Sequence, residues 1–227
     1  MIARRLAGGV VALWGLLSLL GLLLTHVLNS GAVHSADRGA DVWLAAHRTH
    51  QLNTATLIGT GLAQTYTVIA VTVVMVLLLR WRMGRWYESW ILIAAMAGEL
   101  LIFLSVTQIV HRPRPHVHRL DMAPPTSSFP SGHTAAAVAL YGGLTILMLW
   151  IYGRRPATRI AAVVLWCIPV SVGLSRLYRG EHYPTDVLAG ALLGGLWLVV
   201  VISTLLPRLA RPRRQASPRR RVVPGMR

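Results

Sequence analysis

Long apolar runs alternate with short polar segments along most of the chain. A helix needs about 20 mostly apolar residues to cross the hydrocarbon core of a bilayer, and the runs approach or exceed this length. There are six of them, at residues 10–28, 55–79, 89–110, 134–153, 160–175 and 187–206. We therefore predict an all-α fold, in which six transmembrane helices form one bundle domain over residues 1–206.

The amino-terminal part of the chain allows two interpretations. A cleaved signal peptide competes with a membrane span for residues 10–28. This run exceeds the usual h-region of about 7–15 residues, and no small-x-small cleavage site follows it closely, so we prefer the span. In the polar segment that follows, residues 42–46 suggest a short helix at the membrane interface.

Composition supports a membrane protein and excludes other classes. Hydrophobic residues make up 54% of the chain and the mean hydropathy is +0.54, which is too apolar for an ordinary soluble domain. The net charge of +16 comes from arginines that lie between apolar runs and in the final segment, so we expect no nucleic-acid partner. The single cysteine, Cys167, excludes intrachain disulfides and cysteine-based metal sites. Residues 207–227, rich in Arg and Pro, predict a disordered basic tail attracted to anionic lipid.

The arginines also predict the orientation in the membrane. With six spans, the basic residues at 4–5, 80–85, 154–159 and from 208 onward all fall on one side. Cytoplasmic loops carry an excess of Lys and Arg, so this side should be cytoplasmic and both termini with it. We expect a multi-pass protein of the cell (plasma) membrane, whose other polar segments lie outside the cytoplasm.

Three motifs within these outer segments carry residue types suited to phosphate chemistry. The first, residues 112–115, reads Arg-Pro-Arg-Pro after the third apolar run, and the second, residues 130–133, reads Pro-Ser-Gly-His before the fourth. The third, residues 175–186, holds an arginine, a histidine and an aspartate at a helix border, where charged groups cost several kcal/mol unless they have partners or water. Pro184 favours the first turn of a helix, which places His182 just before that helix.

Together the segments resemble the type-2 phosphatidic acid phosphatase family, whose core is shared with the vanadium haloperoxidases. The family pattern is Lys-x6-Arg-Pro, then Pro-Ser-Gly-His, then Ser-Arg-x5-His-x3-Asp. The second and third parts are complete at 130–133 and 175–186. The first part, at 107–115, has Thr107 where the family has Lys. The resemblance implies an active site at the extracytoplasmic ends of the helices.

The resemblance also implies a role for each residue. His182 attacks phosphorus and forms a phosphohistidine, Asp186 holds the other ring nitrogen, and His133 protonates the leaving group and then activates water. The predicted phosphate-binding groups are Arg114, Arg176, Ser131 and Gly132, with Arg112 and Thr107 as further candidates. The two arginines can hold phosphoryl oxygens with forked N–H groups, and the helix start adds backbone donors. We expect no cofactor and no metal, and Arg112 is the best-placed substitute for the missing lysine charge.

Other chemistry remains open for two parts of the sequence. The loop residues His111, His116, His118 and Asp121 have ligand chemistry, although their spacing fits no closed zinc motif. Glu99, within the third run, should face the bundle interior, either in a structural hydrogen bond to Gln64 or Tyr66 or beside the site.

The predicted function is that of an integral-membrane lipid phosphatase. The first candidate substrate is a polyprenyl diphosphate, followed by phosphatidate, phosphatidylglycerol phosphate and lysophosphatidate. The alternative is a non-enzymatic membrane protein with the same fold that binds lipid phosphates or has a regulatory role. It stays open because Thr107 replaces the lysine of the first motif. A soluble vanadium haloperoxidase is a third interpretation, and the six spans argue against it.

Overall fold

The computed structural model describes residues 1–122 and 126–206, and these residues form helices and connecting loops without strands. The predicted tail at 207–227 lies outside the described residues. The helices are α1 (Ile2–Leu22) with a π-helical turn at Leu23–Val27, α2 (Ala32–Ala46), α3 (His50–Gly61), α4 (Thr65–Met83), α5 (Tyr87–Thr107), α6 (Gly132–Ala137) with a π-helical turn at Val138–Gly142, α7 (Gly143–Tyr152), α8 (Pro156–Tyr178) and α9 (Pro184–Leu205).

Six of the helical stretches are long and apolar enough to cross a membrane, which confirms the predicted number of spans. They are Ile2–Val27, Thr65–Met83, Tyr87–Thr107, Gly132–Tyr152, Pro156–Tyr178 and Pro184–Leu205. The chain is therefore a multi-pass membrane protein with an all-α fold.

The second span begins ten residues later than predicted, because residues 50–61 form the separate helix α3. Gly59 lets α3 approach α8 closely: a Cβ at this position would lie 2.3 Å from the Ser175 hydroxyl. The chain then turns after α3, and the Tyr141 hydroxyl donates a hydrogen bond to the carbonyl of Leu62 in this turn. Close packing against α8 thus decides where α3 ends, which the continuous apolar pattern did not show.

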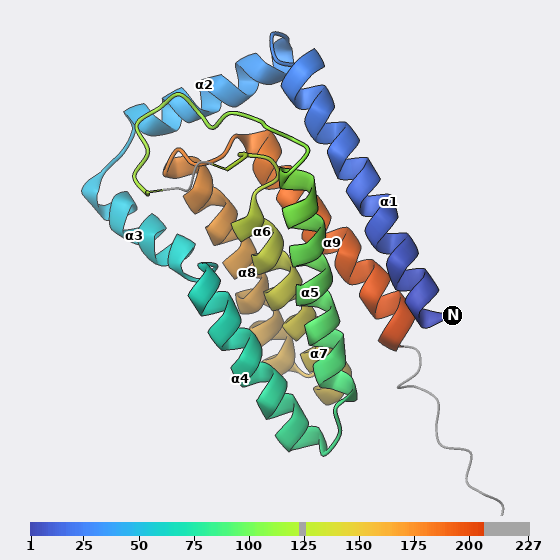
Figure 1. Cartoon of the computed structure of the whole chain (residues 1–227). Helices are drawn as coiled ribbons and strands as arrows, with labels where there is room; N and C mark the ends of the chain where they lie inside the picture. Colours follow the sequence, from blue (N-terminus) through green and yellow to red (C-terminus); the bar gives the residue numbers. More distant parts are fainter. Residues whose placement is uncertain (123–125, 207–227) are drawn as a thin grey trace, which may run out of the picture.

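The continuous helix from Gly132 to Tyr152 is the most buried span and lies in the middle of the bundle (Figure 1). It packs against α5, α8 and α9, while α1 covers α9 and α4 covers α5. Glycines bring α9 against its beginning, since a Cβ at Gly190 would lie 2.4 Å from the Ser131 carbonyl oxygen. This close approach joins the second and third sequence motifs.

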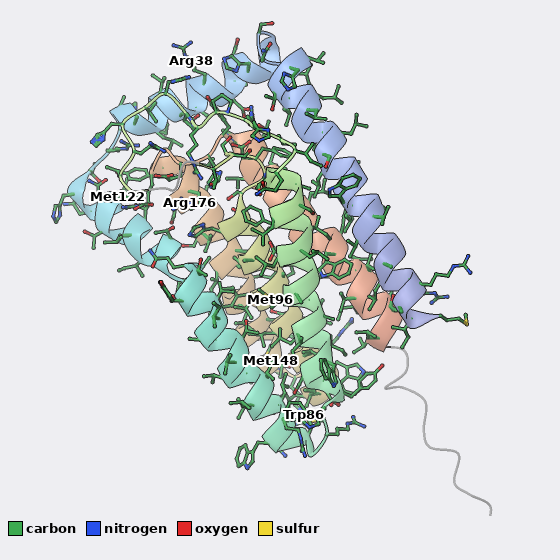
Figure 2. All side chains as sticks on the ribbon, in the orientation of Figure 1. Arg38, Trp86, Met96, Met122, Met148 and Arg176 are labelled. Atoms are coloured by element: carbon green, nitrogen blue, oxygen red, sulfur yellow. The ribbon has the colours of Figure 1, made fainter. Side chains whose placement is uncertain are left out.

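Helix α2 lies across one end of the bundle, where α8 ends and α9 begins (Figure 1). We call this the site end; it also carries the long connection between α5 and α6. The opposite end carries the amino terminus, the short connections α4–α5 and α7–α8, and the end of α9 (Figure 1). Figure 2 shows Arg176 at the site end and Trp86 at the opposite end. The predicted interfacial helix is therefore present as α2, as a cover over the site end.

Candidate active site

Backbone hydrogen bonds join the three motif segments at the site end. The N–H of Ser131 donates to the carbonyl of Asp186, and the N–H of Ser128, just before the second motif, donates to the carbonyl of Arg112 in the first. The N–H of Glu181 donates to the carbonyl of Arg176 and turns the chain back after α8. Segments far apart in the sequence are thus held at fixed distances, which is a requirement for a preorganised site.

His182 is buried, and its ring is oriented by a backbone carbonyl. Its Nδ1 atom lies 2.7 Å from the carbonyl oxygen of Ser128, so Nδ1 carries the proton and donates this hydrogen bond. Asp186 Oδ2 is 4.0 Å from the same nitrogen, beyond hydrogen-bond length, which differs from the expected direct contact. Burial, with the charges of Arg176 and Arg114, holds the pKa of His182 well below 6.5. The ring is therefore neutral, with its Nε2 lone pair available.

Asp186 lies in the first turn of α9, as the position of Pro184 predicts. Its Oδ2 accepts a hydrogen bond of 3.0 Å from the N–H of Tyr183, which closes the turn just after His182. Its Oδ1 accepts from Arg112. The carboxylate therefore acts on His182 mainly through the backbone and as a nearby negative charge.

Arg114 and Arg176, the arginine pair, converge beside His182. Arg114 Nη1 lies 2.9 Å from the carbonyl oxygen of Glu181 and 3.1 Å from its Oε2. Arg176 Nη2 lies 3.6 Å from that same carboxylate oxygen, while its Nη1 donates to Asp121 and Thr60. Both guanidinium groups thus contact Glu181, the residue just before His182, and both charges contribute to the lowered pKa of His182. The structure thus brings together the two arginines that the sequence assigned to phosphate binding.

The start of α6 completes this side of the site. Ser131 is the N-cap residue, but its hydroxyl pairs with the Thr134 hydroxyl at 3.0 Å instead of a helix N–H. Gly132 faces the Phe103 ring so closely that a Cβ would lie 2.7 Å from it. His133 follows in the first turn and is half-buried. Free N–H groups at a helix start favour a bound anion.

Arg112 lies apart from the arginine pair, contrary to its expected role in phosphate binding. Its Nη2 donates to Asp37 Oδ2 at 2.9 Å, and its Nη1 donates to Asp186 and to the Thr185 hydroxyl. The guanidinium also stacks on the Tyr183 ring, 4.5 Å from its centroid. Two carboxylates therefore already balance this buried charge, and it does not replace the missing lysine.

Thr107, in the position of the family lysine, is used within its own helix. Its hydroxyl donates a hydrogen bond of 2.8 Å to the Leu104 carbonyl in the last turn of α5. A different cation lies beside the site instead: Arg119 lines a hollow of about 470 Å³ together with Arg114 and His116. The sequence offered one signal for Arg119, since it lies in the same arginine-rich loop as the first motif.

Two acidic residues that the sequence analysis did not assign to the site form ion pairs with its arginines. Asp37, on α2, reaches Arg112 and accepts two further hydrogen bonds from Thr185. Asp121, considered above as a metal ligand, instead lies 2.9 Å from Arg176 Nη1 and 2.6 Å from Arg179 Nη2. In the described parts of the chain, His, Cys, Asp and Glu form no group of three or more arranged to hold a metal ion.

Glu99 lies in the interior of the bundle, as expected, and is 2% exposed. Neither Gln64 nor Tyr66 forms the expected hydrogen bond with it within residues 1–122 and 126–206. Tyr66 is instead 86% exposed, so it points away from the bundle.

The fold and the site define a polytopic membrane protein with a buried histidine next to a buried carboxylate that two arginines contact. Residues 88–209 match the PAP2 superfamily, so the chain belongs to this family, as the motifs indicated. Phosphatidylglycerophosphatase B of Bacillus subtilis (strain 168) is 26% identical over 79% of this chain and 88% of its own. Undecaprenyl-diphosphatase BcrC of the same strain is 30% identical over 64% of this chain and 70% of its own.

Solved structures show the same fold. The crystal structure of a transmembrane PAP2 type phosphatidylglycerolphosphate phosphatase from Bacillus subtilis superposes with a TM-score of 0.73 at 24% identity, and covers 90% of this chain and 98% of that chain. Aquifex aeolicus LpxE gives a TM-score of 0.55 at 23% identity, over 72% of this chain and 92% of that chain. Both agree with the six-span bundle.

Proposed function

We propose that this protein is an integral-membrane lipid phosphatase that works through a phosphohistidine intermediate. One observation carries the proposal: His182 is buried and donates from Nδ1 to Ser128, which leaves Nε2 as its basic nitrogen, and the preceding residue, Glu181, contacts both arginines of the pair. A neutral imidazole beside fixed cations is suited to attack on phosphorus. Relatives named as lipid phosphatases support the same chemistry.

The reaction follows two displacements. His182 Nε2 forms a bond to phosphorus while the bond from phosphorus to the leaving oxygen breaks, and His133 donates a proton to that oxygen. Water then attacks the phosphohistidine, His133 takes its proton, and inorganic phosphate leaves with His182 restored. The arginine pair balances the charge on the phosphoryl oxygens in both steps, while Ser128 and Asp186 stabilise the positive imidazole.

A groove on the membrane-facing surface supports a lipid substrate. It encloses about 690 Å³ between α3 and α8, and its lining runs from Ala162 to Ser175 along α8. These 14 residues of helix span about 20 Å, which exceeds the roughly 15 Å of hydrocarbon in one leaflet. Ser175 directly precedes Arg176, so a chain in this groove ends beside the arginine pair.

Among lipid phosphates, a polyprenyl diphosphate is our first candidate, and phosphatidate and phosphatidylglycerol phosphate come next. The relatives include an undecaprenyl-diphosphatase and a phosphatidylglycerophosphatase, which act on lipids of these kinds by name. The positive-inside rule places the site end outside the cytoplasm of the plasma membrane, with both termini inside. Headgroups of the outer leaflet would then reach the site directly.

The test is phosphate release by purified protein in detergent, from a panel of lipid phosphates and diphosphates with a chelator present. We expect turnover by the unmodified protein, and a loss of at least about a thousandfold in His182→Ala. His50→Ala, which changes an exposed histidine at the same end, is the matched control and should retain turnover.

Three results would count against the proposal. Turnover that survives His182→Ala would refute the nucleophile, and turnover abolished by the chelator would refute the metal-free mechanism. Binding of lipid phosphates without any release would favour the non-enzymatic alternative, for which Thr107 in place of lysine is the specific observation.

A further inference from the structure

Glu181 is a fully buried carboxylate between the two arginines proposed to bind phosphate. Its side chain is 0% exposed, and its Oε2 lies 3.1 Å from Arg114 Nη1 and 3.6 Å from Arg176 Nη2. Its Oε1 has no hydrogen-bond partner among the described residues. A buried carboxylate oxygen without a donor is costly, so this one calls for an explanation.

The position of Glu181 conflicts with simple phosphate binding. A phosphoryl dianion held by Arg114 and Arg176 would compete with Glu181 Oε2, which now accepts a hydrogen bond from Arg114 and forms an ion pair with Arg176. Two negative groups would then lie side by side in a buried site, where repulsion is weakly screened. The lysine that would add positive charge is replaced by Thr107, so the arginine pair with Glu181 carries a net charge of only about +1.

We infer that Glu181 is an internal counter-anion: it positions Arg114 and Arg176 while the site is empty, and takes up one proton from solvent when an oxyanion binds. The protonated Oε1 then donates a hydrogen bond to the anion. This inference rests on the proposed phosphate site, and it adds a positioning residue that also couples anion binding to pH.

The surroundings of Glu181 favour proton uptake. Burial raises the pKa of its carboxyl group above the usual value, and Asp121 adds to this effect, while the arginines oppose it. A bound dianion adds negative charge and moves this pKa further in the same direction. The charged and titratable groups around the site are Arg176 on α8, Arg114, Arg119 and Asp121 in the loop before α6, His133 on α6, the adjacent His182, and Asp186 on α9.

The sign of the pH effect follows from this linkage. An acid whose pKa rises on binding takes up a proton, so anion affinity is highest at low pH. Affinity then falls as the pH rises above the pKa of Glu181 in the empty site, by up to about tenfold per pH unit. Protonation of histidines also raises anion affinity at low pH. The contribution of Glu181 is therefore the part of the pH dependence of affinity that is lost when Glu181 is substituted.

The experiment compares Glu181→Gln with the unmodified protein in detergent. Tungstate is the probe, because it is a tetrahedral dianion whose charge stays constant from about pH 6 to 9. Binding is measured by thermal shift at several pH values, since a ligand that binds the folded state raises Tm. The amide keeps an acceptor for the arginines and adds an N–H donor. We expect about tenfold tighter binding in Glu181→Gln near pH 8, and a clearly weaker pH slope.

Glu88 offers a matched control at the opposite end of the bundle. It is also 0% exposed, pairs with Arg85 at 2.6 Å, and has an unpartnered oxygen, Oε2. Glu88→Gln therefore removes the same charge from a similar environment, and should bind tungstate as the unmodified protein does. A second variant, Glu181→Ala, removes the acceptor for the arginines and should lower kcat for lipid phosphate more than Glu181→Gln does.

Two outcomes would overturn the inference. One is equal affinity and equal slope in Glu181→Gln and the unmodified protein; the other is weaker binding in Glu181→Gln at every pH. The binding measurement needs no turnover, so it separates the two proposals. If tungstate binds with the expected slope but no lipid phosphate is hydrolysed, the proposed function fails and the role of Glu181 stands.

Discussion

Arginines occur at both ends of the bundle, but in different surroundings. At the site end, Arg112, Arg176 and Arg179 are each about 5% exposed, and each contacts one or two carboxylates. Buried charges persist in proteins when they are paired and hydrogen-bonded, and these arginines meet that condition. The site end is therefore a fixed network of charges whose geometry is set by packing.

At the opposite end, the arginines are solvated. Arg82, Arg154, Arg155 and Arg159 are exposed, and Arg85 is the one arginine there with an ion pair, within the described residues. Exposed arginines near a membrane surface interact with anionic headgroups at about 1 kcal/mol each. The comparison teaches that the same residue type forms a fixed network of ion pairs where it is buried, and is left free to meet water or lipid headgroups where it is exposed. Three substitutions, in order of expected effect, test this contrast.

The largest effect should come from Arg176→Ala compared with Arg154→Ala. Arg176 joins the arginine pair to Asp121 and Thr60, so its loss should lower kcat/KM for lipid phosphate about a thousandfold. Arg154→Ala should change kcat/KM less than about twofold. Both are measured by steady-state phosphate release, and thermal unfolding with Arg176→Lys checks that the fold remains. Equal losses in the two alanine variants would contradict the contrast.

A smaller effect should follow from Asp37→Asn, which weakens the link from α2 through Arg112 to Asp186. We expect kcat to fall about tenfold and the free energy of unfolding to decrease by about 2 kcal/mol, because Arg112 loses one of its two carboxylate partners. Kinetics and thermal unfolding measure the two changes. Unchanged kcat with lowered stability would limit α2 to a structural cover.

Asp41 supplies the control for this substitution, four residues further along α2. Burial, with the charges of Asp37 and Asp186, raises the pKa of Asp41 from 3.8 to about 8. The folded protein then binds a proton that the unfolded chain has lost, so stability declines as the pH rises from about 4 to 8. Asp41→Asn should retain activity and remove this part of the decline.

The smallest effect should come from narrowing the groove. Ala162→Trp should raise KM for long-chain lipid phosphates about fourfold, the equivalent of one buried methylene at about 0.8 kcal/mol. Val164→Trp, at an exposed position on α8 outside the groove, is the control. Short-chain substrates should show no difference between the variants. The same rise in KM for short and long chains would show that the groove does not hold the tail.

Much of the site was visible in the sequence because the motifs place their residues at helix ends. His182, His133, Arg114 and Arg176 meet at the site end as expected. Arg112 was assigned incorrectly to phosphate binding. It belongs with Arg114 to one Arg-Pro repeat, and the local sequence does not show which of the two arginines lies beside His182. Asp37 decides the position of Arg112, and it comes from a helix without a recognisable motif.

The sequence by itself determined the membrane architecture and predicted which groups react. Hydrocarbon thickness sets the length of each span, and backbone polar groups in lipid must pair within a helix, so apolar runs can be converted directly into helices. Only the tertiary structure decided which acceptor holds each charged group. The carbonyl of Ser128 orients His182 across 54 residues, and Glu181 bridges two arginines from different segments. Such contacts depend on how helices pack. Packing in turn depends on close approaches, such as that of Gly59 in α3 to α8 and that of Gly190 in α9 to the start of α6, which the hydrophobic pattern does not contain.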